Sequence, residues 1–259
     1  MHKGWLLVKE KFHNRIFGDK MKKIYIFDVD GTLTPSRQRM TEEFLEFFNG
    51  WSKRYPFYLV TGSDLDKIKE QVPDFILERA NSVFTCCGNE MWVDDEQVYS
   101  KEFKPPNNLL TYLGELVRFS ETPVQSTNHK EDRGSMLNFS VVGRDCTLEE
   151  RHQYFEWDTK VEERKGIVEY IKEQWTDLDA VIGGQISIDI YPKGKDKSQI
   201  LEHIEKLHSS GEIIFIGDGI ENGGNDYPLA KVMEQTDYYS SYQTRDWKHT
   251  QLILESLND

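Results

Sequence analysis

Two aspartates stand one residue apart directly after an apolar run, in the segment YIFDVDGTLT at residues 25–34. On an extended chain Asp28 and Asp30 would face the same side, because side chains two residues apart share a face. One carboxylate of such a pair can attack phosphorus, while the other moves a proton to or from the leaving or entering oxygen. The spacing therefore favours phosphoryl transfer over the alternative, a plain turn at a strand end.

Two carboxylates that face a phosphate would repel it, so this chemistry requires a hard cation, and Mg²⁺ held by oxygen ligands is the most suitable. A third carboxylate, Asp218, ends another apolar run in IIFIGDGIENGGND. Asn225 and Asp226 follow the glycine-rich loop of the same segment. We expect Asp218 to complete the metal site, with Asn225 and Asp226 in its second shell.

Donors for the phosphate oxygens are expected from the segment VTGSD, which follows an apolar run. Thr61 or Ser63 can supply a hydroxyl, and Gly62 can supply its backbone amide. The cationic donor is expected to be Lys197, which lies just before a predicted helix. Two neighbouring lysines are alternatives for that role: Lys193 and Lys195.

Apolar strand-like runs alternate with helical patterns on both sides of the chain's middle. The run KIYIF is followed by a helix in MTEEFLEFFNGWSK, for which Thr41 is the expected N-cap, and then by the run PFYLV. Such alternation predicts an α/β fold with a Rossmann-like three-layer core and a parallel sheet, whose sites lie at the carboxyl ends of the strands. This core is expected at residues 21–90 and 190–259, after an N-terminal extension at 1–20.

The order of predicted elements changes over residues 91–189, where strands and helices no longer alternate. This region includes the hairpin-like EMWVDDEQVYS, the helical NNLLTYLGELVRFS and the strand-like SMLNFSVVG and QISIDIYP. A long charged helix is expected near TKVEERKGIVEYIKEQW. These patterns predict an α+β domain that is inserted into the core.

Composition limits the possible partners of the 259-residue chain. Its formal net charge of −13 and pI near 5.1 argue against nucleic acid and anionic membrane surfaces as partners. No apolar run approaches the roughly 18 residues of a membrane-spanning helix. The three cysteines form no metal-binding pattern and fit a reducing compartment.

Four segments, DVDGT, VTGS, Lys197 and GDGIENGGND, match in order the motifs of the haloacid dehalogenase-like phosphotransferases. The split core also resembles that superfamily, which carries a large cap inserted after the third strand. The resemblance implies that Asp28 is the nucleophile and Asp30 the general acid/base. It further implies that Mg²⁺ is bound by the Asp28 carboxylate, the Asp30 backbone carbonyl and Asp218.

The cap segments RGSMLNFSVVGRDCTLEER and GGQISIDIYPKGKDK resemble the cap signatures of eukaryotic-type phosphomannomutases. The guanidinium group of arginine can donate two hydrogen bonds to one phosphate, and a hydroxyl or a carboxylate can bind the hydroxyl groups of a sugar. The plainer alternative for any one arginine is an ion pair on a helix face. On the matching positions, the sugar-phosphate contacts of that family fall on Arg37, Arg133, Asn138, Arg144, Arg151, Ser187 and Asp189.

This second resemblance implies a Mg²⁺-dependent mutase that interconverts mannose 6-phosphate and mannose 1-phosphate, with a hexose 1,6-bisphosphate as activator. The reaction would pass through an aspartyl phosphate and a bisphosphate intermediate. A cytosolic homodimer joined through the caps is also implied. A sugar-phosphate phosphatase on the same scaffold is the main alternative, and a non-catalytic sugar-phosphate binder is a lesser one.

Three departures from the family pattern lie close to these motifs. TCCGNE replaces the usual Pro-Glu-Asn-Gly segment, and Gly219 replaces the lysine that usually follows the strand-end aspartate. The stretch YPLAKVMEQT lacks the acidic loop that holds an additional cation in the family, so we expect no second metal site.

Overall fold

The computed structural model describes residues 23–208 and 211–257, and the expected extension at residues 1–20 lies outside them. These residues divide into two compact units. The first contains the described chain up to Ser100, then Asp196–Asn222 and the chain from Asp226 onward. The second contains Lys101–Lys195 with Gly223–Asn225.

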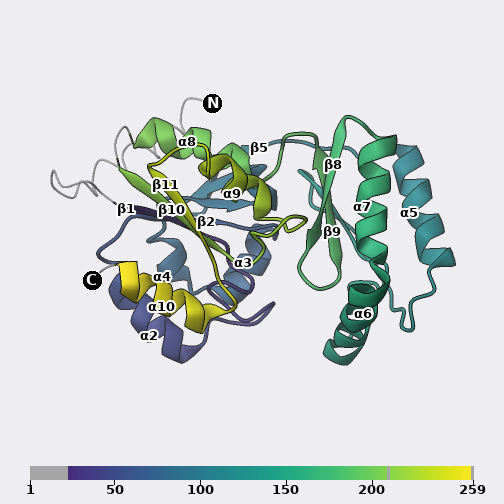
Figure 1. Ribbon diagram of the computed structural model, residues 1–259, viewed down its shortest axis with the longest axis horizontal. Helices are drawn as coiled ribbons and strands as arrows, with labels where there is room; N and C mark the ends of the chain where they lie inside the picture. Colours follow the sequence, from purple (N-terminus) through teal and green to yellow (C-terminus); the bar gives the residue numbers. More distant parts are fainter. Residues whose placement is uncertain (1–22, 209–210, 258–259) are drawn as a thin grey trace. The chain divides into compact units, whose positions relative to one another are not determined.

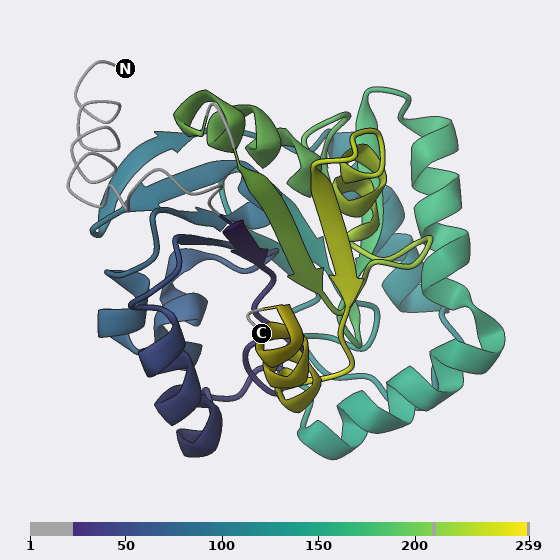
Figure 2. The same cartoon turned by 60° about the vertical axis from the view of Figure 1, so that its left-hand side comes forward.

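A seven-stranded sheet in the order β11-β10-β1-β2-β3-β4-β5 forms the centre of the first unit (Figures 1 and 2). Pairing is parallel from β11 to β3 and antiparallel from β3 to β5. The strands are β1 (Lys23–Phe27), β2 (Phe57–Val60), β3 (Val83–Thr85), β4 (Glu90–Val93), β5 (Glu96–Ser100), β10 (Glu212–Gly217) and β11 (Tyr239–Gln243).

Helices cover both faces of this sheet (Figure 1). Alternate residues of β1 belong to two separate cores, Tyr25 and Phe27 to one and Ile24 and Ile26 to the other. The three-layer α/β expectation is thereby confirmed. The first core is closed by α2 (Glu42–Trp51), α3 (Leu65–Gln71), α4 (Asp74–Leu77) and α10 (Trp247–Leu257), and the second by α8 (Ile200–Leu207) and α9 (Tyr227–Met233).

Helix α2 shows how the sequence specifies these layers. The hydroxyl of Thr41 accepts a hydrogen bond from the amide of Phe44, as expected of its N-cap. Phe44, Phe48 and Trp51 recur at the spacing of one helical face and are buried in the first core.

The second unit contains a four-stranded antiparallel sheet in the order β6-β7-β9-β8, with helices over one face (Figure 1). Its own core joins the apolar residues of this sheet to those of the helices. The elements are α5 (Asn107–Phe119), β6 (Lys130–Asp132), β7 (Leu137–Phe139), α6 (Leu148–Val161), α7 (Glu163–Gln174), β8 (Leu178–Gly183) and β9 (Ser187–Pro192).

The boundaries of this second unit differ from the expected cap, residues 91–189. The hairpin of β4 and β5 continues the first-unit sheet because β4 pairs with β3. Strand β9 runs past residue 189 because its pairing with β8 extends to Pro192.

The helix expected near residues 159–175 is present as α7 (Glu163–Gln174), but residues 159–161 belong to the end of α6, because the helix is interrupted at Glu162. Glu162 adopts a left-handed conformation (φ 57°). The Asp158 carboxylate then accepts hydrogen bonds from the Arg164 amide (2.9 Å) and from its Nε (2.7 Å). This buried carboxylate accepts from a backbone amide in the first turn of α7 that has no partner within the helix, and it stabilises the interruption between α6 and α7.

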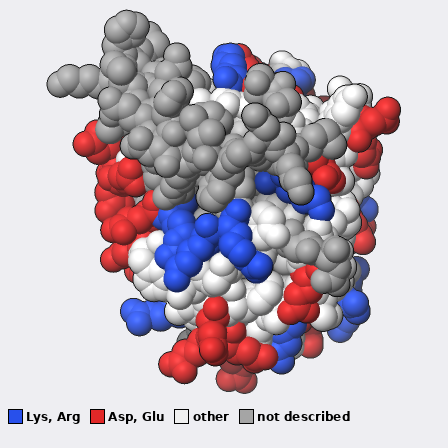
Figure 3. All heavy atoms as spheres, turned by 90° about the vertical axis from the view of Figure 1, so that its left-hand side faces the viewer, with Lys and Arg blue, Asp and Glu red and all other residues white. Residues whose placement is uncertain are grey.

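Charge is unevenly distributed over the surface. In the view of Figure 3, Lys and Arg side chains gather near the centre of a face that also carries Asp and Glu side chains. The net charge of −13 is therefore an average, and the exclusion of polyanionic partners stays a prediction. Within the described residues, no helix is long and apolar enough to cross a membrane.

Candidate active site

The first unit brings the predicted core motifs to one edge of its sheet. Asp28 follows the last residue of β1, and Asp218 follows the last residue of β10. These strands are parallel neighbours, with Phe27 opposite Ile216. The two carboxylates therefore emerge side by side at the carboxyl ends of the strands, as the sequence predicted.

Lys197 links two of the carboxylates in this cluster. Its Nζ lies 2.7 Å from Asp28 Oδ1 and 2.6 Å from Asp226 Oδ1, and its side chain is fully buried. The residue opens a short 3₁₀ helix, where Asp196 caps the amide of Ser198. The structure thus distinguishes Lys197 from Lys193, which is exposed.

The surroundings shift the ionisation of these groups. Burial alone would lower the pKa of the Lys197 ammonium, but Asp226 and Asp28 outweigh it and raise that pKa. Burial raises the pKa of the Asp28 carboxyl well above its usual range, although Lys197 opposes the shift. Desolvation, with Asp226 adding its charge, raises the pKa of Asp218 to about 7. The single positive charge of Lys197 therefore does not balance the negative charge of the Asp28, Asp218 and Asp226 carboxylates.

This surplus of negative charge suits a divalent cation. Asp28, Asp218 and Asp226 each offer a carboxylate oxygen, and the three oxygens lie within 4.8 Å of one another. Mg²⁺ prefers oxygen ligands, and carboxylates are common among them, so the donor set fits Mg²⁺. Both oxygens of Asp226 also accept hydrogen bonds from the protein, Oδ1 from Lys197 and Oδ2 from the amide of Gly219. The second-shell position expected for Asp226 stays a prediction. Asn225 belongs to the short stretch Gly223–Asn225, which is grouped with the second unit.

Gly217 leaves room for Asp226, and the backbone of Gly219 donates a hydrogen bond to it. Asp226 Oδ2 accepts this hydrogen bond from the amide of Gly219 at 2.9 Å. A Cβ at Gly217 would lie 2.5 Å from the same oxygen. Gly219, which departs from the family pattern, therefore contributes its backbone to the position of Asp226.

Asp30 lies in the turn that follows β1, which ends at Phe27. The carbonyl of Val29 accepts hydrogen bonds from the amides of residues 32–34 in this turn. Asp30 Oδ1 accepts from Gln71 Nε2 (2.8 Å) and from the backbone amide of Arg37 (2.7 Å). The shared face of Asp28 and Asp30 stays a prediction. The side chain of Arg37 is exposed.

Gly31→Ala tests the spacing between the turn and the metal site. Gly31 has φ +81°, and a Cβ there would lie 2.2 Å from Asp218 Oδ2. We expect the variant to lose activity at least about tenfold and to require more Mg²⁺, because Asp218 must move and the backbone is strained by about 1–2 kcal/mol. Titration of activity with Mg²⁺ measures both effects.

Gly50→Ala is the matched control, because a Cβ at Gly50 on α2 meets nothing within 4 Å. Its activity and Mg²⁺ requirement should equal those of the parent protein. If Gly31→Ala also behaves like the parent, the close approach to Asp218 has no role in metal binding.

The predicted phosphate-binding segment forms a tight loop after β2. Thr61 is buried, and its Oγ1 accepts from the amide of Ser63 at 3.1 Å. The carbonyls of Thr61 and Ser63 accept from the amides of Cys87 and Cys86. Gly62 lies at the tip of this loop, which the TCCGNE segment therefore supports. All three cysteines of the protein are free thiols.

Four predicted cap residues form one polar network in the second unit. Asn138 Nδ2 donates to Asp189 Oδ1 at 2.6 Å. Arg144 Nη1 donates to Asn138 Oδ1 and, at 3.2 Å, to Ser187 Oγ. The network thus gathers four of the predicted substrate contacts. Glu131 connects Arg133 to this network through Arg144. Arg151 is a buried residue of α6.

Two glutamine side chains that contact the site were not predicted from the sequence. Gln71 contacts Asp30 as described, and Gln243 binds the loop after β10. Gln243 Nε2 donates to the carbonyl of Asp218, and its Oε1 accepts from the amide of Ile220 at 3.0 Å. Neither glutamine belongs to a motif, although Gln71 stands out as a polar residue among the buried positions of α3.

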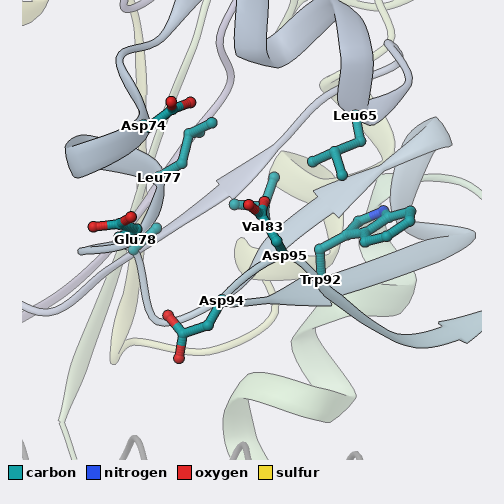
Figure 4. Close-up of a pocket in the computed structure, with 9 residues that line it drawn as sticks. Leu65, Asp74, Leu77, Glu78, Val83, Trp92, Asp94 and Asp95 are labelled. Atoms are coloured by element: carbon teal, nitrogen blue, oxygen red, sulfur yellow. The ribbon is translucent and has the colours of Figure 1, made fainter.

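A pocket in the first unit lies away from these motifs, between α4 and the hairpin of β4 and β5 (Figure 4). Its apolar floor is rimmed by carboxylates. The lining residues are Leu65, Asp74, Leu77, Glu78, Ala80, Val83, Trp92, Asp94 and Asp95.

Comparison with known proteins decides the family. A sequence profile described as eukaryotic phosphomannomutase matches residues 43–255. The chain belongs to the eukaryotic phosphomannomutase family. The phosphomannomutase of Encephalitozoon cuniculi is 39% identical over 223 residues, which cover 80% of this chain and 84% of the relative. That of Drosophila melanogaster is 38% identical over 224 residues, covering 80% and 85%.

Solved structures agree with this phosphomannomutase family assignment at the level of the fold. The Streptococcus mutans protein SMU.1108c has a TM-score of 0.61 at 14% identity, covering 92% of this chain and 99% of its own. A haloacid dehalogenase-like hydrolase from Bacteroides thetaiotaomicron has a TM-score of 0.53 at 15% identity, covering 91% and 99%. The chain therefore shares the α/β fold of these structures.

Proposed function

We propose that this member of the phosphomannomutase family interconverts mannose 6-phosphate and mannose 1-phosphate. The observation that carries the proposal is the buried contact of Lys197 with Asp28, beside the carboxylates of Asp218 and Asp226. The names of the relatives support the choice of sugar. The cap network of Asn138, Asp189 and its neighbours supports recognition of a sugar phosphate.

In the proposed reaction, Asp28 attacks the phosphorus of a hexose 1,6-bisphosphate, and the bond from phosphorus to the sugar oxygen breaks. Asp30 gives its proton to that oxygen. The aspartyl phosphate then passes the phosphoryl group to a hexose monophosphate, whose attacking hydroxyl returns its proton to Asp30. Lys197 balances the charge of Asp28 throughout, and Thr61 and Ser63 supply donors to the phosphoryl oxygens.

Asp28, Asp218 and Asp226 would hold Mg²⁺, together with the carbonyl of Asp30. When bound, Mg²⁺ offsets charge on the transferring phosphoryl group and on these carboxylates. Gln71 orients Asp30 through its Oδ1, which leaves Oδ2 to carry the proton.

The decisive assay follows two products at once from mannose 1-phosphate, with and without a catalytic amount of hexose 1,6-bisphosphate. We expect mannose 6-phosphate to accumulate without stoichiometric inorganic phosphate. Turnover should stop with a chelator and return with added Mg²⁺. Rapid release of phosphate without isomerised sugar would reject the mutase.

That rejecting outcome would instead support a sugar-phosphate phosphatase, the second candidate. The departures that favour it are Cys86 and Cys87, which replace the family's Glu-Asn and support the loop of Thr61 and Ser63. Water that reaches an aspartyl phosphate hydrolyses it, so the two functions differ in how well the site excludes water.

We further propose a homodimer joined through the caps. Exposed apolar side chains on cap helices support it, with Phe119 70%, Leu148 73% and Val161 54% exposed. Light scattering should give twice the mass of the chain, and a monomer at micromolar concentration would contradict it. Three free thiols also support a cytosolic location, which cell fractionation would test.

A further inference from the structure

A carboxylate in the second unit stands between two of the predicted phosphate-binding arginines. Glu131 Oε2 accepts from Arg133 Nη2 at 2.7 Å and from its Nε at 3.2 Å. The same oxygen lies 3.0 Å from Arg144 Nε. One carboxylate oxygen therefore contacts both guanidinium groups.

The sheet register explains why these groups meet. Glu131 on β6 lies opposite Asn138 on β7, which lies opposite Asp189 on β9. Their neighbours Leu137 and Phe139 point into the core of the second unit, so this cross-strand row occupies the opposite face. Glu131 and Asn138 thus hold Arg144 from two adjacent strands, because Asn138 accepts from Arg144 Nη1.

The two arginine side chains are fixed in place, since each is only 4% exposed, whereas Glu131 is 26% exposed. Two guanidinium groups this close repel each other, and long side chains lose rotamer entropy when they bind a ligand. A shared carboxylate offsets the repulsion and sets both forks before the ligand arrives.

We propose that Glu131 is a positioning residue that holds Arg133 and Arg144 side by side as one anion site for a hexose phosphate. The inference rests on the proposed function for the identity of the ligand. Glu131 has two opposing effects on such a site. Its negative charge repels phosphate and weakens binding, whereas its acceptor oxygen holds the two arginine side chains in place and strengthens binding. Because the two guanidinium groups lie close together, we expect the positioning effect to be the larger one.

Two substitutions separate these effects. Glu131→Ala removes the acceptor and the charge, and we expect KM for mannose 1-phosphate to rise about tenfold with kcat within about twofold. Glu131→Gln keeps an acceptor oxygen, and its KM should stay within about threefold of the parent value. Glu115→Ala, at an exposed position on α5, is the matched control and should leave both constants unchanged.

Binding without turnover distinguishes failure of this inference from failure of the proposed function. Calorimetry with mannose 6-phosphate is done in an Asp28→Asn background, where Glu131→Ala should weaken Kd about tenfold. That weakening supports the inference even if the parent enzyme proves to be a phosphatase. A Kd or KM within twofold of the parent value overturns it, whatever happens to the melting temperature. A fall in kcat with unchanged KM, or no binding by the background protein, also overturns it.

Discussion

Asp28→Asn is expected to abolish turnover while leaving the protein at least as stable as the parent. The amide cannot form an aspartyl phosphate, so kcat should fall at least about 10³-fold. Folding raises the pKa of this carboxyl, which means that keeping it ionised at neutral pH costs stability. The neutral amide removes that cost and can still accept from Lys197. Product assays and thermal melting measure the two effects.

Asp66→Asn is the control, because Asp66 is an exposed acid on α3 of the same unit. Its activity should stay within twofold of the parent value. If Asp28→Asn retains more than a few percent of turnover, Asp28 is not the nucleophile. A large drop in its melting temperature would contradict the electrostatic account of the site.

Lys197→Met is expected to impair stability as well as activity. Without the ammonium, Asp28 and Asp226 remain buried beside each other with no cation from the protein. Removing one partner of a buried ion pair costs about 3–5 kcal/mol, which corresponds to a fall of roughly 10 °C in melting temperature. Turnover should be undetectable, because charge on the nucleophile is no longer balanced.

Lys193→Met, four residues earlier and exposed, is the matched control and should melt with the parent protein. Melting curves are recorded in a chelator, so that metal does not replace the lost charge. If Lys197→Met melts within 1–2 °C of the parent protein, the ammonium does not stabilise the buried carboxylates.

Local sequence patterns predicted the layers and the edge of the sheet that carries the site. Alternating strands and helices placed Asp28 and Asp218 at neighbouring strand ends, and parallel pairing of β1 with β10 confirmed this. The lysine preceding a helix was also placed correctly, since Lys197 contacts Asp28.

Sequence patterns did not indicate the contacts that depend on a turn or on a distant partner. Asp30 lies in the turn after β1 and contacts Gln71. Asp226 lies close to Asp28 and Asp218, where Gly217 leaves room for it. Periodicity carries no information on such contacts.

The sequence did not indicate the proposed role of Glu131, for a related reason. It lies on a three-residue strand, too short for an alternation pattern, and its partners Arg133 and Arg144 come from either side of β7. Only the register of β6 on β7 shows that these residues meet.

The order of strands in the first unit has a consequence for synthesis on the ribosome. Strand β1 lies inside its sheet, between β10 and β2, but β10 is completed only at Gly217, after the whole of Lys101–Lys195. The second-unit sheet pairs only strands from within that interval, so its partners are already present while one edge of β1 still awaits its neighbour. During translation one edge of the apolar strand β1 therefore stays unpaired until most of the chain has been synthesised. Such an edge can pair with other chains, so we expect chaperones to bind the nascent protein in this interval.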